Sequence, residues 1–386
     1  MMSFKRGFLF SLVAVACTSM AFTAGYLVRE YQNPGLGQFP ILNQAYSILS
    51  ANALRDLPEP PSLEYGMIRG MVQAFDDPYT IFVEPVQHEL ETNSLEGKFG
   101  GIGVQLSRNQ NGELVLFPFP DGPAARAGII EGDQLIAVED LQIEPGTSME
   151  AIQAAIRGPE GKSVKLTIGH PPDFLPVEIS IRRAAIALPS VIWHLDPDHP
   201  QIGVIKINTV AASTPDEIHE AVSDLESRKA TSFILDLRDN GGGLLTTGVD
   251  TAKLFLKEGV VIQEQYRDQD VETFRVEKPG PLSDISLAVL INQGTASAAE
   301  IIAGALQAHH RALLIGAPTF GKDTVQLVFD LKDGSSLHVT AGRWWIPDLD
   351  LPLGEKGLQP DVAVNSEDGN PNSAIAAASK VLLGGQ

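Results

Sequence analysis

A serine stands where a short loop opens a predicted helix, and this position could make its hydroxyl a nucleophile. The run 287–291 before the loop is apolar, as in a buried strand, and residues 298–308 have a helical pattern. The positive end of the helix dipole would face the hydroxyl of Ser297, and the free amide of Ala298 could bind an oxyanion. Ser297 and Glu300 also match a Ser-x-x-Glu capping box, so a purely structural role stays open.

A lysine and a glutamine four residues apart could supply the general base. The stretch 322–331 alternates between polar and apolar residues, which predicts a strand with Lys322, Thr324 and Gln326 on its polar face. The opposite, packed face would carry Val325, Leu327, Phe329 and Leu331. A lysine accepts a proton only when it is neutral, so it needs a water-poor site that lowers its pKa, and Gln326 could hold the uncharged amine. The alternative is a solvated lysine on a strand face.

Three glycines follow the apolar run 232–237 and could shape an oxyanion site. Glycine lets a backbone approach a ligand closely and turn its amides toward it. An amide of Gly242 or Gly243, in the run that begins at Gly241, could be the second oxyanion donor beside Ala298. A plain turn and a phosphate-binding loop are the alternatives, although no Gly-Lys-Ser/Thr follows.

The composition excludes several other classes of function. The 386 residues carry a net charge of −20, and no run rich in Lys or Arg occurs, so a nucleic-acid partner is not expected. The single cysteine, Cys17, permits no intrachain disulfide. No cluster of Cys and His has the spacing of metal ligands, so we expect neither a metal nor another cofactor.

The N-terminus predicts export from the cytoplasm. Two basic residues precede the apolar run 7–28, which is long enough to span a bilayer. Residues 1–30 would then be a signal or transmembrane anchor, with the rest of the chain on the periplasmic or cell-surface side. Cleavage near Ala24 and lipidation of Cys17 remain as alternatives.

Four further segments differ in pattern and predict a multi-domain α/β protein. Residues 38–96 have mainly helical periodicity, and residues 97–183 combine short strands, glycine turns and two helices, as in a small β-sandwich. Residues 184–365 alternate strands with helices, which predicts an α/β core with crossover connections. Residues 366–386 form a tail that ends in a weakly helical run.

Together these features resemble peptidase family S41, the carboxy-terminal processing (tail-specific) proteases, from about Phe39 to Val364. The resemblance implies a serine endopeptidase with Ser297 as nucleophile, Lys322 as general base and Gln326 as its partner, and without a metal or cofactor. It rests on motifs in the family's order: Asp76-Asp77-Pro78-Tyr79, Gly101-Ile102-Gly103, Leu235-Asp236-Leu237-Arg238 with Asn240 and Gly242-Gly243, Ser297-Ala298, Thr319-Phe320-Gly321-Lys322 with Gln326, and Gly357-Leu358 with Pro360-Asp361.

The chain departs from the family pattern at a few positions. Thr295 and Ala299 replace the outer two serines of the family motif, and Gly241 stands where proline is usual. Asp323 follows Lys322 where glycine is common. A carboxylate close to the amine would raise its pKa, although strand alternation sends Asp323 to the opposite face.

The resemblance also implies that residues 97–183 are a PDZ domain inserted before the protease core. In such a domain the terminal carboxylate of a peptide lies on amides of a glycine-rich turn, and the peptide adds a strand beside residues 104–106. The helix 148–157 would form the other wall of the groove. The residues expected to bind the peptide are Gly101, Ile102, Gly103, Val104, Ile152 and Ile156.

The expected partners are therefore polypeptide substrates held by their C-termini and the membrane, and a homo-oligomer is left open. One rival function is a PDZ-containing peptide-binding scaffold that has lost its activity. Another is a Ser-His-Asp hydrolase, although the chain lacks a Gly-x-Ser-x-Gly motif.

Overall fold

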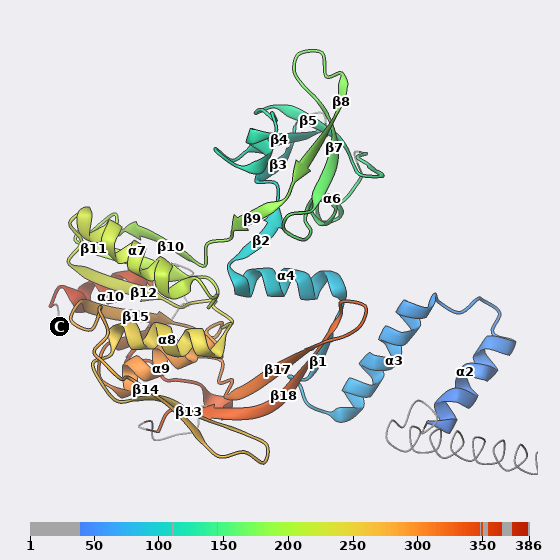
Figure 1. Ribbon diagram of the computed structural model, residues 1–386. Coiled ribbons are helices and arrows are strands. Elements are labelled where there is room, and N and C mark those ends of the chain that lie inside the picture. The colour runs from blue at the N-terminus through green and yellow to red at the C-terminus, as the bar shows by residue number, and fades with distance from the viewer. Residues whose placement is uncertain are drawn as a thin grey trace, which may run out of the picture. The chain divides into compact units, whose positions relative to one another are not determined.

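The computed structural model describes residues 39–109, 112–144, 146–347, 349, 354–364 and 373–384 (Figure 1). The chain divides into two compact units, Met1–Ala74 and Phe75–Gln386. Among the described residues, no helix is both long enough and apolar enough to cross a bilayer. The predicted membrane span, residues 7–28, lies outside the described residues.

Two helices come first in the described part of the chain. Helix α2 (Pro40–Asn52) and helix α3 (Pro60–Phe75) each begin at a proline, whose missing N–H costs nothing in the first turn. Neither helix has a buried residue. Large apolar side chains are instead exposed along both: Ile41, Tyr46, Ile48, Leu49, Met71 and Phe75.

A six-stranded sheet of the core is mostly parallel and carries helices on both faces. Its strands run in the order β10 (Val191–Leu195), β11 (Ile202–Ile207), β12 (Ser232–Asp236), β15 (Ser286–Ile291), β16 (Leu313–Gly316) and β19 (Val362–Ala363). All are parallel except β10, which pairs antiparallel with β11. The crossover rhythm read from the sequence therefore predicts this core correctly.

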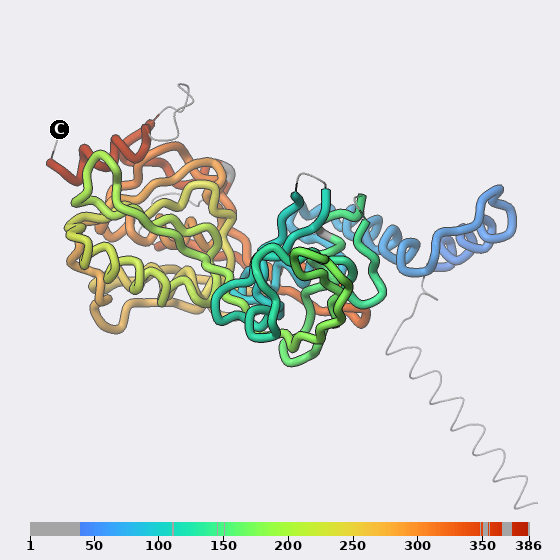
Figure 2. The backbone as a smooth tube through the Cα atoms, turned by 90° about the horizontal axis from the view of Figure 1, so that it is seen from above, coloured from blue at the N-terminus to red at the C-terminus, as the bar shows by residue number. Residues whose placement is uncertain are grey.

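One apolar cluster packs three helices on one face of this sheet: α7 (Thr214–Ser227), α8 (Leu245–Phe255) and α9 (Ala298–Ala308). A second cluster joins Ala374 and Ala378 of α10 (Ser373–Leu382) to side chains of β11, β12, β15 and β16. Helix α10, dark red in Figure 2, therefore covers the opposite face. The run expected to end a polar tail is part of the packed core.

A second sheet holds the hairpin that follows Lys322; the lysine itself lies just before the strand that was expected to carry it. Strand β18 (Ser336–Trp345) lies between β1 (Ile81–Val83) and β13 (Val260–Tyr266), β14 (Glu272–Arg275) follows β13, and β17 (Thr324–Asp330) also pairs with β18.

The prediction of a packed apolar face on β17 is wrong for most of the strand. Val325 is buried, but Leu327 and Phe329 are 39% and 50% exposed, and Leu331 is exposed as well. Polar and apolar residues do alternate in the sequence, but the register is irregular between Val325 and Gln326. Beyond this point the rest of the protein leaves the side chains of Leu327 and Phe329 exposed.

Residues 98–187 contain a small sheet with a core of its own. Its strands are β3 (Val104–Arg108), β4 (Leu114–Pro118), β5 (Asp133–Val138), β7 (Ser163–Gly169) and β8 (Pro176–Arg182), with β6 (Leu141–Gln142) beside β5. The helices are α5 (Pro123–Arg126) and α6 (Met149–Ile156), and Ser148 caps α6 by accepting a hydrogen bond from the amide of Ala151. Helix α4 (Pro85–Glu96) leads into β2 (Lys98–Gly101), which pairs with β9 (Ala184–Ala187).

Candidate active site

The sheet topology brings the three candidate segments of the sequence to one place. The glycine turn follows β12, the loop to Ser297 follows β15, and the segment to Lys322 follows β16. These three strands are parallel neighbours, with Asp236 opposite Leu290 and Ile291 opposite Gly316. Carboxyl ends of parallel strands share one edge of a sheet, where ligands of α/β proteins usually bind.

Main-chain and hydroxyl hydrogen bonds lock the three segments together around Thr295. Its hydroxyl donates to the carbonyl of Leu237 at 2.8 Å, and its own carbonyl accepts from the amide of Phe320 at 2.9 Å. The amide of Ala296 donates to the carbonyl of Asn240 at 2.9 Å. Thr295 is fully buried, so the residue that replaces the family's serine at this position has a structural role.

Ser297 has a strained backbone at the turn from β15 into α9. Its φ of 54° and ψ of −122° lie in a region that residues other than glycine rarely adopt. A sharp strand-to-helix turn of this kind presents a nucleophilic side chain. The turn needs a glycine opposite it, because a Cβ atom on Gly242 would lie 2.9 Å from the Cβ of Ser297 and 3.0 Å from the nitrogen of Ala298.

Glu300 connects the serine segment to the lysine segment. Its Oε2 accepts hydrogen bonds from the amides of Ser297 and Lys322, both at 2.9 Å. Its Oε1 accepts from the amide of Gly321 at 2.7 Å and from the hydroxyl of Thr319 at 2.5 Å. The Glu300 half of the capping box is therefore present, and the same carboxylate also holds the backbones of Ser297 and Lys322 on one oxygen atom.

The carboxyl of Glu300 is fully buried, and burial raises its pKa while these four donors pull it down, with the balance upward. We expect Glu300→Gln to lower the free energy of unfolding by about 3 kcal/mol, because an amide NH₂ would face N–H donors. Turnover by the folded enzyme should fall at least about tenfold, since the serine and lysine segments lose their common anchor.

Glu217→Gln is the matched control for that variant. Glu217 also accepts hydrogen bonds from main-chain amides, those of Ser190 and Val191 at 2.8 Å, but on helix α7. The Glu217→Gln variant should have a lower free energy of unfolding, measured by chemical denaturation, while its folded fraction keeps the wild-type turnover. Equal turnover of folded Glu300→Gln and Glu217→Gln would contradict the linking role of Glu300.

The Lys322 amine is partly buried and has a defined partner. Its Nζ donates to Oε1 of Gln326 at 2.7 Å. Burial lowers the pKa of Lys322 from the ordinary value of 10.5, while the charges of Asp77 and Glu300 oppose the shift. Asp323, the sequence neighbour that raised concern, is not among the charges that act on this amine.

Amides near Ser297 differ in their availability to an oxyanion. Ala298 opens α9, where helix geometry leaves the amide without an intrahelical partner. The amide of Gly242 already donates to Oδ1 of the buried Asn240 at 2.8 Å. Of the two expected glycine donors, only Gly243 has an amide that makes no hydrogen bond within the described part of the chain.

A separate groove lies in the small sheet domain. A cavity of about 280 Å³ is lined by Ile102, Gly103, Val104 and Ile156, together with Leu106 and Arg157. Strand β3 is an edge strand, so its free side could accept another strand. Ile152 is fully buried in the domain core and does not line this cavity, unlike the prediction, because α6 turns that side chain inward.

Sequence reasoning missed several residues that build the candidate centre. The sequence suggested only a helix-capping role for Glu300, and Asp77 and Tyr79 were only part of a family motif. The buried polar residues Thr319 and Asn240 were parts of motifs without a role. No group of three or more His, Cys, Asp or Glu side chains within the described ranges could hold a metal ion.

Comparisons with known proteins agree with this architecture. Residues 201–364 match the model of peptidase family S41, and residues 120–168 match a PDZ domain. A carboxyl-terminal-processing protease of Picosynechococcus sp. is 35% identical over 306 residues, which cover 78% of this chain and 73% of the relative. The carboxy-terminal processing protease CtpA of Bacillus subtilis is 31% identical over 369 residues, 94% of this chain and 78% of the relative.

Among solved structures, a photosystem II D1 C-terminal processing protease is 26% identical, with coverage of 83% of this chain and 87% of its own and a TM-score of 0.45. The family assignment rests on the sequence relatives, which are similar over most of both chains. This chain belongs to peptidase family S41 and carries a PDZ domain.

Proposed function

We propose that this peptidase cleaves protein substrates near their C-termini with Ser297 as nucleophile and neutral Lys322 as general base. The observation that carries the proposal is the buried carboxylate of Glu300, which holds the backbones of both residues on one oxygen atom. The amine of Lys322 lies beside Gln326 in a site that favours its neutral form. A lysine-activated serine needs a neutral amine, which the burial of Lys322 favours.

The proposed reaction has two halves, acylation of the serine and hydrolysis of the acyl-enzyme. Lys322 Nζ takes the proton of the Ser297 hydroxyl as Oγ bonds to the peptide carbonyl carbon, and the amides of Ala298 and Gly243 stabilise the oxyanion. The tetrahedral species collapses, the C–N bond breaks, and the leaving amine receives the proton from Lys322. A water molecule, deprotonated by Lys322, then hydrolyses the acyl-enzyme and returns Ser297 to its hydroxyl form.

The PDZ domain, to which we assign residues 97–183, would bind the substrate C-terminus and deliver the chain to the core at 184–365. The cavity between β3 and α6 supports this role, because its floor is apolar and the β3 edge is unpaired. The carboxylate would lie on amides of the turn 101–104. The inactive-scaffold alternative predicts binding of the same C-termini without cleavage.

The test compares one unstructured polypeptide with a free and with an amidated C-terminus, both ending in an apolar residue. We expect kcat/KM to fall at least about tenfold for the amidated form, because this substrate lacks the carboxylate that the amides of the turn 101–104 would bind. Gln153→Trp, at a partly exposed residue of the cavity lining, should cause a similar loss by filling the groove, while Val177→Trp on the exposed face of β8 should not. Equal rates for both substrates would refute C-terminal recognition.

We further propose that residues 1–30 anchor the enzyme to the cytoplasmic membrane with its domains outside the cytoplasm. The basic flank and the apolar run 7–28 support this. A mature chain that begins near Gly25, measured by mass spectrometry, would show cleavage instead.

A homo-oligomer is proposed on a different observation. Helices α2 and α3 have no buried residue yet carry a series of exposed apolar side chains. Surfaces of this kind usually pack against a partner. Deletion of residues 39–75 should convert the oligomer to a monomer in analytical ultracentrifugation, and a full-length monomer would dismiss the idea.

A further inference from the structure

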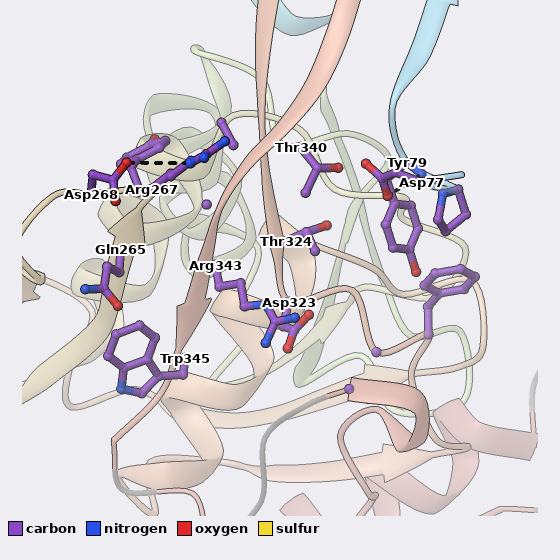
Figure 3. A pocket seen from close by; sticks show the side chains of 17 residues that line it. Asp77, Tyr79, Gln265, Arg267, Asp268, Asp323, Thr324, Thr340, Arg343 and Trp345 are labelled. Carbon is purple, nitrogen blue, oxygen red and sulfur yellow. Dashed lines mark hydrogen bonds and ion pairs between the residues drawn. The ribbon is translucent and has the colours of Figure 1, made fainter. Parts of the chain in front are cut away.

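The turn before β1 lies beside the lysine hairpin, although it is far from it in sequence. Strand β1 pairs with β18, and β18 pairs with β17, which begins two residues after Lys322. Figure 3 shows Asp77 and Tyr79 of this turn next to Thr340 of β18 and Thr324 of β17. They line one side of a cavity of about 840 Å³ whose lining also includes Gly321 and Asp323, on either side of Lys322.

Hydrogen bonds hold the turn in place against β18. The carboxylate of Asp77 accepts a hydrogen bond from the amide of Tyr79 at 3.3 Å and another from the hydroxyl of Thr80 at 2.5 Å. The buried hydroxyl of Thr80 in turn accepts a hydrogen bond from the amide of Thr340 at 3.2 Å. These hydrogen bonds of the neighbouring residues therefore fix the position of Tyr79.

Tyr79 makes two contacts with the lysine centre. Its ring centroid lies 5.1 Å from Nζ of Lys322, within the range of an interaction between a cation and an aromatic ring. Its main-chain carbonyl accepts a hydrogen bond from Nε2 of Gln326, which is 247 positions away in sequence.

The second contact decides which end of the Gln326 amide meets the amine. A carbonyl oxygen can only accept, so the NH₂ group of Gln326 must face Tyr79, and Oε1 must face Lys322. The amine then donates one N–H to Oε1, and its lone pair remains unoccupied when it is neutral. With the amide reversed, the NH₂ group would donate to that lone pair and block the base.

We infer that Tyr79 is a positioning residue of the Ser297–Lys322 centre: its ring shields the lysine amine from water, and its carbonyl orients Gln326 so that the amine keeps a free lone pair. This inference rests on the proposed function. It assigns a task in the reaction to the turn 76–80, for which the sequence motif implied no role.

The charged and titratable groups around Lys322 come from three elements. Asp77 lies on the same turn as Tyr79, and Glu300 lies on α9; both charges raise the pKa of Lys322. On β18, burial lowers the pKa of His338, Glu91 raises it, and the charges of His88 and Lys322 lower it.

Removal of the ring has two opposite effects on the amine. An aromatic face attracts the charged form, but it also excludes water that would solvate that form better. Burial is the largest influence on the pKa of Lys322, ahead of any charge. When the ring is removed, the better access of water should therefore outweigh the lost attraction between the ring and the cation. The pKa of Lys322 should rise, so the amine should become harder to deprotonate.

The experiment measures kcat/KM against pH for the full-length enzyme on the free-C-terminus substrate. In the wild type the rate should rise with pH as Lys322 loses its proton. In Tyr79→Ser this acid limb should move up by about one pH unit, so that activity is about tenfold lower on the limb and recovers toward high pH. Tyr79→Phe keeps the ring and should restore the limb to the wild-type position.

Tyr266→Ser is the matched control, because Tyr266 lines the same cavity from β13, whereas the hydrogen bond and the ring contact of the Lys322 amine involve Gln326 and Tyr79. Its limb should coincide with that of the wild type. If Tyr79→Ser is not recovered folded, as judged by its melting temperature, Tyr79→Asn carries the same expectation, since asparagine is well accommodated in turns.

Two results would overturn the inference: an unchanged limb in the folded Tyr79 variant, or a loss that is equal at every pH, as a merely structural role produces. Failure of the proposed function looks different. In that case Ser297→Ala would still cleave the substrate, whatever the Tyr79 variants do.

Discussion

Ser297→Ala is expected to abolish peptide cleavage, with a loss in kcat of roughly 10⁴-fold or more. The alanine keeps the amide that donates to Glu300 and removes only the hydroxyl, so the local structure should persist. The other hydroxyl of this loop, that of Thr295, is buried and already hydrogen-bonded to Leu237 and Asn292. The measurement is kcat on an unstructured polypeptide with an apolar, free C-terminus, together with the affinity for its C-terminal peptide.

Peptide binding by Ser297→Ala should match the wild type, because the groove between β3 and α6 is formed by other residues. Ser227→Ala at the exposed end of α7 serves as the control and should cleave normally. A residual rate above one-tenth of the wild type would remove Ser297 from the role of nucleophile. Wild-type enzyme that binds peptide and never cleaves would favour the inactive scaffold.

Lys322→Met is expected to cost about 10³-fold or more in kcat, because the serine loses its base. Methionine has a similar unbranched shape, and the main-chain amide of residue 322 would still donate to Glu300. Lys322→Arg should be equally inactive, since a guanidinium cannot be deprotonated in a protein. Lys253→Met, at a surface ion pair with Asp250 on α8, is the control and should retain full activity.

The pH dependence of the wild type follows from the direction of the Lys322 pKa. Burial lowers this pKa below 10.5, and the reactive form is the neutral amine. Activity should therefore be low where the amine is protonated and should rise with pH through a midpoint below 10.5. An active Lys322→Arg enzyme, or a wild-type rate that falls as pH rises through this range, would exclude Lys322 as the base.

Local patterns in the sequence predicted the elements that carry these residues. The helix expected at 298–308 is α9 with the same bounds, and the apolar runs 232–237 and 287–291 correspond to β12 and β15. Hydrophobic periodicity and turn residues act over a few positions, so they can be read from the chain without its fold. The resemblance to family S41 added the candidate roles of Ser297, Lys322 and Gln326.

Long-range contacts could not be predicted in this way. The sequence of β17 shows alternating apolar residues. Whether other elements bury Leu327 and Phe329 depends on distant parts of the chain, and in the structure both side chains are exposed. Ile152 and Ile156 share one helical stripe, yet only Ile156 reaches the groove. The Ser-x-x-Glu pattern predicted a cap without revealing that the same carboxylate reaches residues 319–322.

The amino-acid order was enough to identify the nucleophile and base candidates and the α/β core, because side-chain type and short-range periodicity are properties of the chain itself. The arrangement around them arose in three dimensions. Parallel pairing of β12, β15 and β16 placed three loops at one edge, and the pairing of β1 with β18 brought Tyr79 to Gln326. Such contacts form when a sheet assembles from distant strands, so no local pattern encodes them.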